Sequence, residues 1–403
     1  MRAVGLALLL AGLVLPTAAA GPVADPGITS NSILLGGTVP LSGPAAAFAN
    51  VAPGANAYFR YLNDRGGVHG RKIRYRYVDD GFEVGRTVEE TRKLVQQDRV
   101  FAIFNSIGTE HAIAVRPYLN QVRVPHLFIG TGASTFSRER AEFPWSLGYL
   151  PSFSGEGALY GRYIARNLPK ARIGVLHENT DYGKDLTAGL RRGLGRASGK
   201  VIAVRSYEIT DSDVNSQIAQ LKRSGANTFM LFATPGFAIQ GYISAHRQNW
   251  RPRIFISSVS IEPQIMGVIR LNTNARATEG AISMGYLKDP TSPVWAKDAG
   301  VALYRRIMRR YLPRSKPSDV YHFYGMAVAH SMAHTLRKAG RNLTRAGLLR
   351  AATHLDQRDN PFLLPGIAVR TSPQNYFPIS KAKLHRYSRQ GRWVPFGPLL
   401  TAR

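Results

Sequence analysis

The chain of 403 residues contains no cysteine. This absence excludes disulfide bonds, thiolate metal ligands and the attachment of a lipid to an N-terminal cysteine. Beyond the first residues the chain also lacks any apolar run near the roughly 20 residues that a membrane-spanning helix needs. A chain of this length without disulfides must be stabilised by its own apolar core, and its length suggests about two or three domains.

Acidic residues are scarce. The chain has 25 Asp and Glu against 53 Lys and Arg, which gives a formal net charge of +28. Such an excess can indicate nucleic acid, anionic lipid or an acidic polymer as partner. The basic residues are scattered without long runs, and no nucleic-acid-reading motif accompanies them. We therefore interpret the charge as a solvated arginine-rich surface with a general attraction to acidic surfaces, and expect no nucleic-acid partner.

The first 20 residues resemble a secretory signal peptide. They contain one positive charge at Arg2, an apolar run to Leu15 and a small-residue cleavage site at Ala18–Ala20. This pattern predicts a protein that is exported to the periplasm, with a mature chain that begins near Gly21 and carries no lipoprotein cysteine.

From Ser32 onward, short apolar strands alternate with amphipathic helices, which predicts α/β architecture with doubly wound parallel sheets. The alternation runs in two series that meet near Leu150, so we expect two α/β halves in tandem. Long helices follow near 294–311 and 318–339, and a shorter helix near 344–354. In the tail, only short strand-like pieces are expected, at 366–370 and 383–387.

The stretch from Phe101 to Thr135 is the centre of the first half. It reads as strand, small polar turn, helix, strand and a second small polar turn. In a parallel sheet both turns lie at the edge where ligands bind, and the N–H groups that open the following helices favour an anion there. The candidates for holding a ligand carboxylate are Ser106, Ala133, Ser134 and Thr135.

Several motifs in order along the chain are similar to one known family. They include Gly36–Pro44, Gly66–Ile73, Asp79–Asp80, Thr131–Ser134 and Asp181–Asp185. Together they resemble the Leu/Ile/Val (branched-chain amino acid) type of periplasmic substrate-binding protein over essentially the whole mature chain. The resemblance implies the type I periplasmic-binding-protein fold, with two lobes joined by three crossover segments that close on a small solute.

The resemblance also implies boundaries and partners. The first lobe is expected at 28–150 plus 287–357 and the second at 151–286 plus 358–403.

The solute would pass to the permease and ATPase subunits of an ABC importer. We expect a monomer without cofactor, metal or enzymatic activity. The alternative is a ligand sensor of the same fold that acts on a membrane signalling partner. A hydrolase using Ser106 or Ser134 lacks a His/Asp partner in the sequence.

In family members that bind amino acids, the resemblance places the carboxylate at Ser106, Ala133 and Ser134. It also places ligand contacts in the second lobe at Tyr182, near Thr234, and at an acid that corresponds to Ser258. Here residues 233–237 and 256–260 contain no carboxylate. A buried ammonium without a partner costs several kcal/mol, which favours a carboxylate with a neutral or aromatic body, or an amide-like solute. A shifted alignment would let Glu262 supply the acid.

Structural roles compete with these functional ones. Ser106, Ser134 and Thr135 have side chains that commonly cap helices. Tyr182 could pack in the core, and Phe48 could form either a lid over the ligand or a core contact. Asp79 and Asp80 follow a strand and precede a helix, which favours capping or an ion pair over catalysis. His330 and His334 lie in an apolar helix, where packing is favoured over metal binding.

Overall fold

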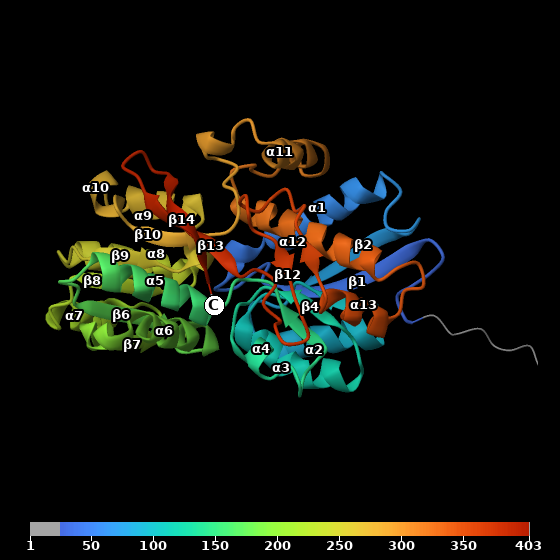
Figure 1. Cartoon of the computed structure of the whole chain (residues 1–403), viewed down its shortest axis with the longest axis horizontal. Coiled ribbons are helices and arrows are strands. Elements are labelled where there is room, and N and C mark those ends of the chain that lie inside the picture. The colour runs from blue at the N-terminus through green and yellow to red at the C-terminus, as the bar shows by residue number, and fades with distance from the viewer. Residues whose placement is uncertain (1–24, 403) are drawn as a thin grey trace, which may run out of the picture.

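The computed structural model describes residues 25–402, so the expected signal peptide lies outside the described residues. The chain forms two lobes that lie side by side, each built on its own sheet (Figure 1). We call the lobe with the five-stranded sheet lobe 1 and the lobe with the seven-stranded sheet lobe 2. Within the described part, no helix has both the length and the apolar character needed to cross a membrane.

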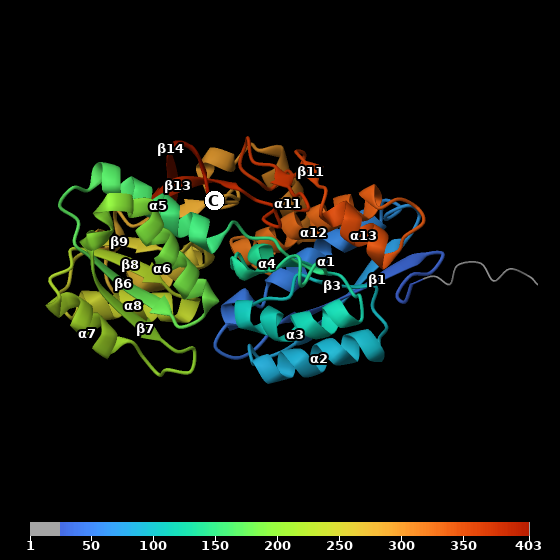
Figure 2. The ribbon, with the colours of Figure 1, turned by 60° about the horizontal axis from the view of Figure 1, so that its bottom comes forward.

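Lobe 1 contains a wholly parallel sheet in the order β2-β1-β3-β4-β5. Its central strands are buried on both faces, as the continuous apolar runs predict. Helices α2 and α3 cover one face, and α1, α12 and α13 lie on the other (Figure 2). The elements are β1 (Ser32–Val39), α1 (Val51–Asn63), β2 (Lys72–Asp79), α2 (Val84–Gln96), β3 (Ala102–Phe104), α3 (Thr109–Gln121), β4 (His126–Ile129), α4 (Thr135–Arg138) and β5 (Ser146–Gly148).

Three later helices complete lobe 1. They are α11 (Ala299–Tyr311), α12 (Val320–Lys338) and α13 (Arg345–Ala352). Helix α12 packs directly on α1, where a Cβ at Gly325 would lie 2.1 Å from the carbonyl oxygen of Val51. The two backbones therefore approach as closely as glycine allows, and a segment from the last quarter of the chain fills the core beneath β1.

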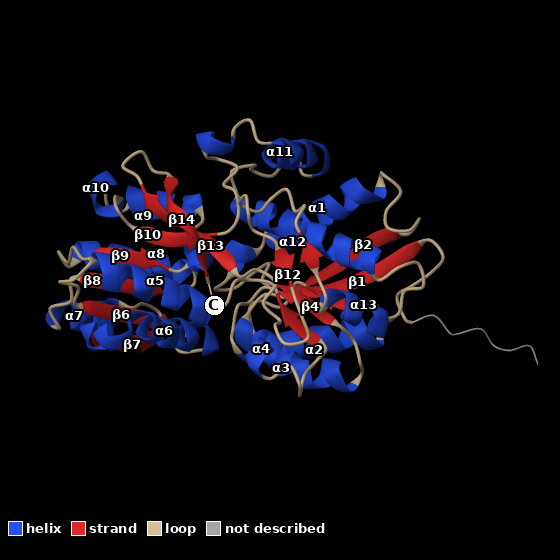
Figure 3. Cartoon of the chain, in the orientation of Figure 1, coloured by secondary structure: helices blue, strands red, loops and turns tan. Residues whose placement is uncertain are grey.

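Lobe 2 has the sheet order β14-β13-β10-β9-β8-β6-β7. Strands β6 to β10 are parallel, and the hairpin β13–β14 adds antiparallel pairs at one edge (Figure 3). The elements are α5 (Phe153–Asn167), β6 (Ile173–Glu178), α6 (Asp181–Leu194), β7 (Val201–Tyr207), α7 (Asn215–Arg223), β8 (Thr228–Phe232), α8 (Pro235–Arg247), β9 (Arg253–Ile256), α9 (Pro263–Leu271), α10 (Ala275–Thr278), β10 (Ile282–Gly285), β13 (Lys381–Tyr387) and β14 (Trp393–Thr401).

Helices α5 and α6 of lobe 2 are also joined through glycine. A Cβ at Gly157 would lie 2.0 Å from the carbonyl oxygen of Leu186, and a Cβ at Gly189 would lie 2.1 Å from that of Ser154. Any side chain at these positions would push the helices apart. The pair therefore forms one closely packed layer on the sheet.

The third boundary between the lobes differs from the expected one. Residues 358–379 were expected in lobe 2, but Phe362, Ile367 and Ile379 are buried in the core of lobe 1. The short strands β11 (Asp356–Gln357) and β12 (Val369–Arg370) also pair there. The chain crosses to lobe 2 only near Lys381, because the apolar side chains of 362–379 are needed to close the first core.

Candidate functional site

A cavity of about 490 Å³ lies between the two lobes, at the carboxyl ends of strands from both sheets. Lobe 1 contributes the loop after β3 and the start of α12, and lobe 2 contributes the loops after β6, β8 and β9. The volume is within the range of about 300–1,000 Å³ that is usual for small-molecule sites. The position is the one at which parallel α/β sheets bind ligands.

Aromatic side chains from both lobes line the cavity. Phe48 packs edge-on against Tyr321 with ring centroids 5.1 Å apart, and Phe153 packs against Tyr182 at 4.8 Å. Such a wall excludes water and binds an apolar body through its large contact area. The aromatic residues of the wall are Phe48, Phe82, Phe153, Tyr182, Tyr286, Tyr321, Phe323, Tyr324 and Trp393.

The predicted site residues divide into two groups. Phe48, Tyr182, Thr234 and Ser258 line the cavity, whereas Ser106, Ala133, Ser134 and Thr135 do not. In lobe 1 the wall is formed instead by residues 107–111 and Gly130, which lie beside the predicted positions. In lobe 1 the side chains that face the cavity are therefore neighbours of the predicted residues in the chain.

Ser134 bonds to lobe 2 instead of facing the cavity. Its backbone N–H and its hydroxyl donate to the two carboxylate oxygens of Asp185 on α6, at 2.6 and 2.7 Å. A second link joins the same region, since the Asp181 N–H donates to Glu110 at 2.9 Å. The anion position at the start of α4 is therefore occupied by a carboxylate of this chain, and these links hold the lobes together beside the cavity.

Ser106 is buried in the wall behind the cavity. Its carbonyl oxygen accepts from the Gly130 N–H at 2.8 Å, which joins the ends of β3 and β4. Its hydroxyl has no partner among residues 25–402. Ser106 does not cap α3, because Gly108 occupies the N-cap position with φ of 110°. Ser106 therefore neither caps α3 nor lines the cavity in this arrangement.

Thr234 and Ser258 donate hydrogen bonds to buried carboxylates of lobe 2. The Thr234 hydroxyl donates to Glu178 at 3.0 Å, and the Tyr207 hydroxyl donates to the same oxygen at 3.0 Å. The Ser258 N–H and hydroxyl donate to Glu156 at 2.7 and 2.6 Å. Burial raises the pKa of both glutamates. These contacts stabilise the wall, and they leave Thr234 and Ser258 few free donors for hydrogen bonds to a solute.

Glu262 and Tyr182 retain free polar atoms at the wall of lobe 2. One Glu262 oxygen caps α9 by accepting from the Ile265 N–H at 3.0 Å, and the other has no partner in the described chain. Burial, with a smaller effect of nearby Asp319, raises the pKa of Glu262 to about 7. The Tyr182 hydroxyl is likewise without a well-formed hydrogen bond. Residues 233–237 and 256–260 supply no carboxylate, but Glu262, the acid that a shifted alignment allowed, lines the cavity.

His111 was missed by the sequence analysis. It lies one turn into α3, faces the cavity and stacks on Phe82 with ring centroids 4.0 Å apart. Neither ring nitrogen has a partner in the part of the chain that the structure describes, and burial lowers the pKa of the ring. Its position in the first turn of the helix after the Gly108 turn was the available signal.

The other flagged groups have structural roles. Asp79 accepts from the N–H groups of Leu41 and Gly81 and forms an ion pair with Arg86 at 3.4 Å, and Asp80 accepts from the Thr87 hydroxyl. The ion-pair interpretation therefore holds for Asp79, whereas neither residue is the N-cap of α2, a position that Glu83 occupies. His330 accepts or donates a hydrogen bond with Gln357 at 2.9 Å and packs against Tyr58, as the packing interpretation predicts. Within residues 25–402, no three His, Asp or Glu side chains gather as a metal site would require.

Comparison with known proteins agrees with this architecture. The sequence matches the family model "Periplasmic binding protein" over residues 32–386. The Leu/Ile/Val-binding protein homolog 1 of Brucella abortus is 27% identical over 215 residues, which are 52% of this chain and 56% of the relative. The chain thus spans about half the length of the curated relatives that it matches.

Solved structures share the fold over nearly the whole chain. A substrate-binding periplasmic protein from Ralstonia solanacearum has a TM-score of 0.79 and 22% identity, covering 91% of this chain and 100% of its own. A branched-chain amino acid ABC transporter protein from Thermus thermophilus with bound valine has a TM-score of 0.80 and 16% identity, covering 93% and 97%. The predicted resemblance is therefore confirmed: the chain belongs to the periplasmic binding protein family and has its type I two-lobed fold.

Proposed function

We propose that this protein is the extracytoplasmic receptor of an ABC importer and that it captures an amino-acid-like solute with an apolar, preferably aromatic, body. The observation that carries the proposal is the cavity between the lobes, which has aromatic side chains from both lobes and unpartnered polar atoms buried in its wall. The Leu/Ile/Val-binding names of the curated relatives support the same solute class.

The cavity offers a separate contact for each part of such a solute. Its body would lie among the aromatic rings. Its carboxylate would accept from the N–H groups that open α3, where the helix dipole favours negative charge. Its ammonium would pair with the free oxygen of Glu262, and the Tyr182 hydroxyl would supply a further hydrogen bond.

The buried acid decides between an amino acid and a simple carboxylate. Glu110, Glu178 and Glu262 all line the cavity, and Lys288 in the same wall is already paired with Asp298 at 2.8 Å. A solute with a carboxylate and no positive group would add a further negative charge to this wall. An ammonium would remove that repulsion, which supports an amino-acid-like solute over the simple carboxylate favoured by the sequence analysis.

The protein would act by binding and release, without bond chemistry. Solute contacts to both lobes would favour the closed arrangement. In this proposal the chain is exported by its signal peptide, works as a monomer in the periplasm and delivers its solute to the permease and ATPase subunits.

A thermal-shift screen of the chain from Gly21 onward tests the proposal. Phenylalanine, leucine and valine would be compared with phenylpropionate, which lacks the ammonium, and phenethylamine, which lacks the carboxylate. The melting temperature should rise with the amino acids as RT ln(1 + [L]/Kd) requires, and much less with the other two. Equal shifts with phenylpropionate would refute the role of the ammonium, and no shift with any compound would refute the solute class.

A further inference from the structure

The outer end of lobe 2 is strongly basic. The parallel strands of this lobe begin at the end farthest from the cavity, and the segments that precede them gather there with the β13–β14 hairpin. We call this end the basic pole. It comprises residues 166–172, 191–200, 222–227, 247–253, 270–281 and 386–392, which contain 17 Lys and Arg and one acid, Glu279.

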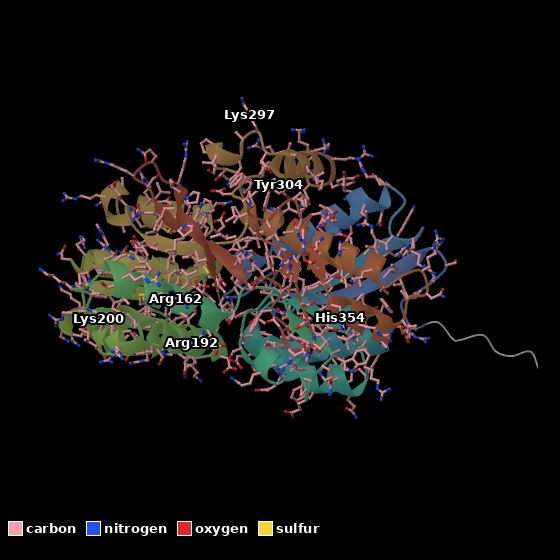
Figure 4. All side chains as sticks on the ribbon, in the orientation of Figure 1. Arg162, Arg192, Lys200, Lys297, Tyr304 and His354 are labelled. Atoms are coloured by element: carbon pink, nitrogen blue, oxygen red, sulfur yellow. The ribbon has the colours of Figure 1, made fainter. Side chains whose placement is uncertain are left out.

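The positive charges of the basic pole are not neutralised by the chain itself. None of the 17 cations forms an ion pair with a residue among 25–402. Figure 4 shows nitrogen-tipped side chains at this end, with Lys200 labelled there. Burial is the main cause that lowers the pKa of Arg162. The positive charges of the neighbouring Arg192 and Arg166 lower it further, as expected where like charges lie close together.

The acids of lobe 2 lie at its other end. Glu178, Asp185 and Glu262 are at the cavity or the link between lobes, and Asp211 and Asp213 follow β7. Lobe 1 shows no such separation, since acids are mixed with the cations at its outer end; these are Asp25, Asp64, Asp98 and Glu142, which precede strands or follow helices at that end. The excess of positive charge at the basic pole is therefore local, and it does not follow only from the positive net charge of the chain.

An exposed apolar residue accompanies the charge. Leu271 ends α9 between Arg270 and Arg276, and its side chain is 86% exposed, the highest value among the large hydrophobic residues of the described chain. None of the exposed large hydrophobic residues in residues 25–402 is aromatic, so the pole has no stacking platform for nucleic-acid bases. Clustered cations with a protruding aliphatic side chain are typical of proteins that bind the surface of an anionic bilayer.

A groove lies at the basic pole, and its lining includes the one acid of the pole, Glu279. It has a volume of about 790 Å³ and is lined by Lys170, Arg251, Arg253 and Arg386. Arg251 is positioned by donating to the His246 carbonyl at 2.7 Å, and Arg386 lies 4.7 Å from the ring centre of Phe396. From this charge, groove and exposed leucine, we propose that the basic pole binds the phosphate head groups of an anionic membrane, which leaves the cavity at the opposite end of the lobe accessible.

Sedimentation with vesicles tests the proposal. Wild-type chain would be mixed with phosphatidylcholine vesicles with and without phosphatidylglycerol, at low and high NaCl. The pole variant replaces Lys170, Arg223, Arg253 and Arg276 with Gln. Its matched control replaces Arg99, Arg123, Lys338 and Arg341 in lobe 1, and so loses the same charge. All eight side chains are exposed.

The wild type should sediment only with anionic vesicles, and salt should release it. Each cation at such a surface strengthens binding about fivefold, so the pole variant should bind at least about 100-fold more weakly while the control stays near wild type. Leu271→Ser should weaken binding at unchanged charge. Equal losses in both quadruple variants would overturn the proposal, because the attraction would then follow net charge. Tighter binding to labelled duplex DNA than to vesicles at the same salt would also overturn it.

Discussion

The buried Glu262 predicts a pH-dependent stability that can be measured without any solute. Burial raises its pKa from 4.5 to about 7. Because the folded chain holds this proton more tightly than the unfolded chain, the stabilisation is fully present below pH 4.5 and is lost as the pH rises through 7. From these two pKa values, the loss between pH 5 and pH 8 is about 2.5 kcal/mol.

Glu262→Gln isolates this contribution from all other titrating groups. The amide is neutral at every pH and can still accept from the Ile265 N–H through its oxygen. Calorimetry would measure the melting temperatures of wild type and variant at pH 5 and pH 8. For a chain of this length, 2.5 kcal/mol corresponds to about 3 °C, so the variant should gain about 3 °C relative to wild type between the two pH values.

Glu279→Gln is the matched control, because Glu279 is an exposed acid of the same lobe. Its melting temperature relative to wild type should be the same at both pH values. The reasoning is refuted when the difference in melting temperature between Glu262→Gln and wild type is the same at both pH values, since burial would then not raise the pKa of Glu262.

Three further changes probe the framework of the site. Asp185→Ala removes the link between the lobes and should favour the open form by about 2 kcal/mol, seen as a larger solute-free radius of gyration by X-ray scattering; an unchanged radius contradicts this. Gly189→Ala should destabilise the chain by about 1–3 kcal/mol in urea unfolding, whereas Gly199→Ala, which meets no atom within 4 Å, should change little. Arg116→Met removes the 2.6 Å ion pair with Glu139 and should cost about 2 kcal/mol at pH 7. That cost should shrink as the pH falls toward 2, because Arg138 and Arg116 together hold the Glu139 pKa near 2 against the effect of burial, and a cost independent of pH argues against the role of the pair.

The alternation of elements could be predicted because each buried parallel strand is an uninterrupted apolar run. Strand β14 could not, since Pro395, Gly397 and Pro398 interrupt its sequence, and proline is tolerated only because this strand forms the sheet edge. The third boundary was misplaced because sequence does not reveal which of two cores the apolar residues between 362 and 379 will enter.

In the candidate site, Phe48 was expected from its place after the first strand and Tyr182 from the resemblance, and both line the cavity. The resemblance could not show that Ser134 binds Asp185, because a helix N-terminus attracts any carboxylate and Asp185 lies 51 positions away. The resemblance left Glu262 as an alternative to Ser258. The two residues are four positions apart, and only the path of the loop after β9 shows that Glu262 brings its carboxylate to the cavity. His111 gave only a weak signal, its place in the first turn of α3, because one histidine on a helix is usually a packing residue.

The order of segments along the chain has a consequence for how the protein is made. Lobe 1 needs α12 and residues 362–379 to cover its sheet, and lobe 2 needs β13 and β14 to complete its own. A nascent chain that has emerged only as far as β10 therefore exposes unfinished apolar surface on both halves at once. Such a chain would depend on a chaperone that covers this apolar surface until its last residues are available. Neither lobe could fold first and then support the folding of the other.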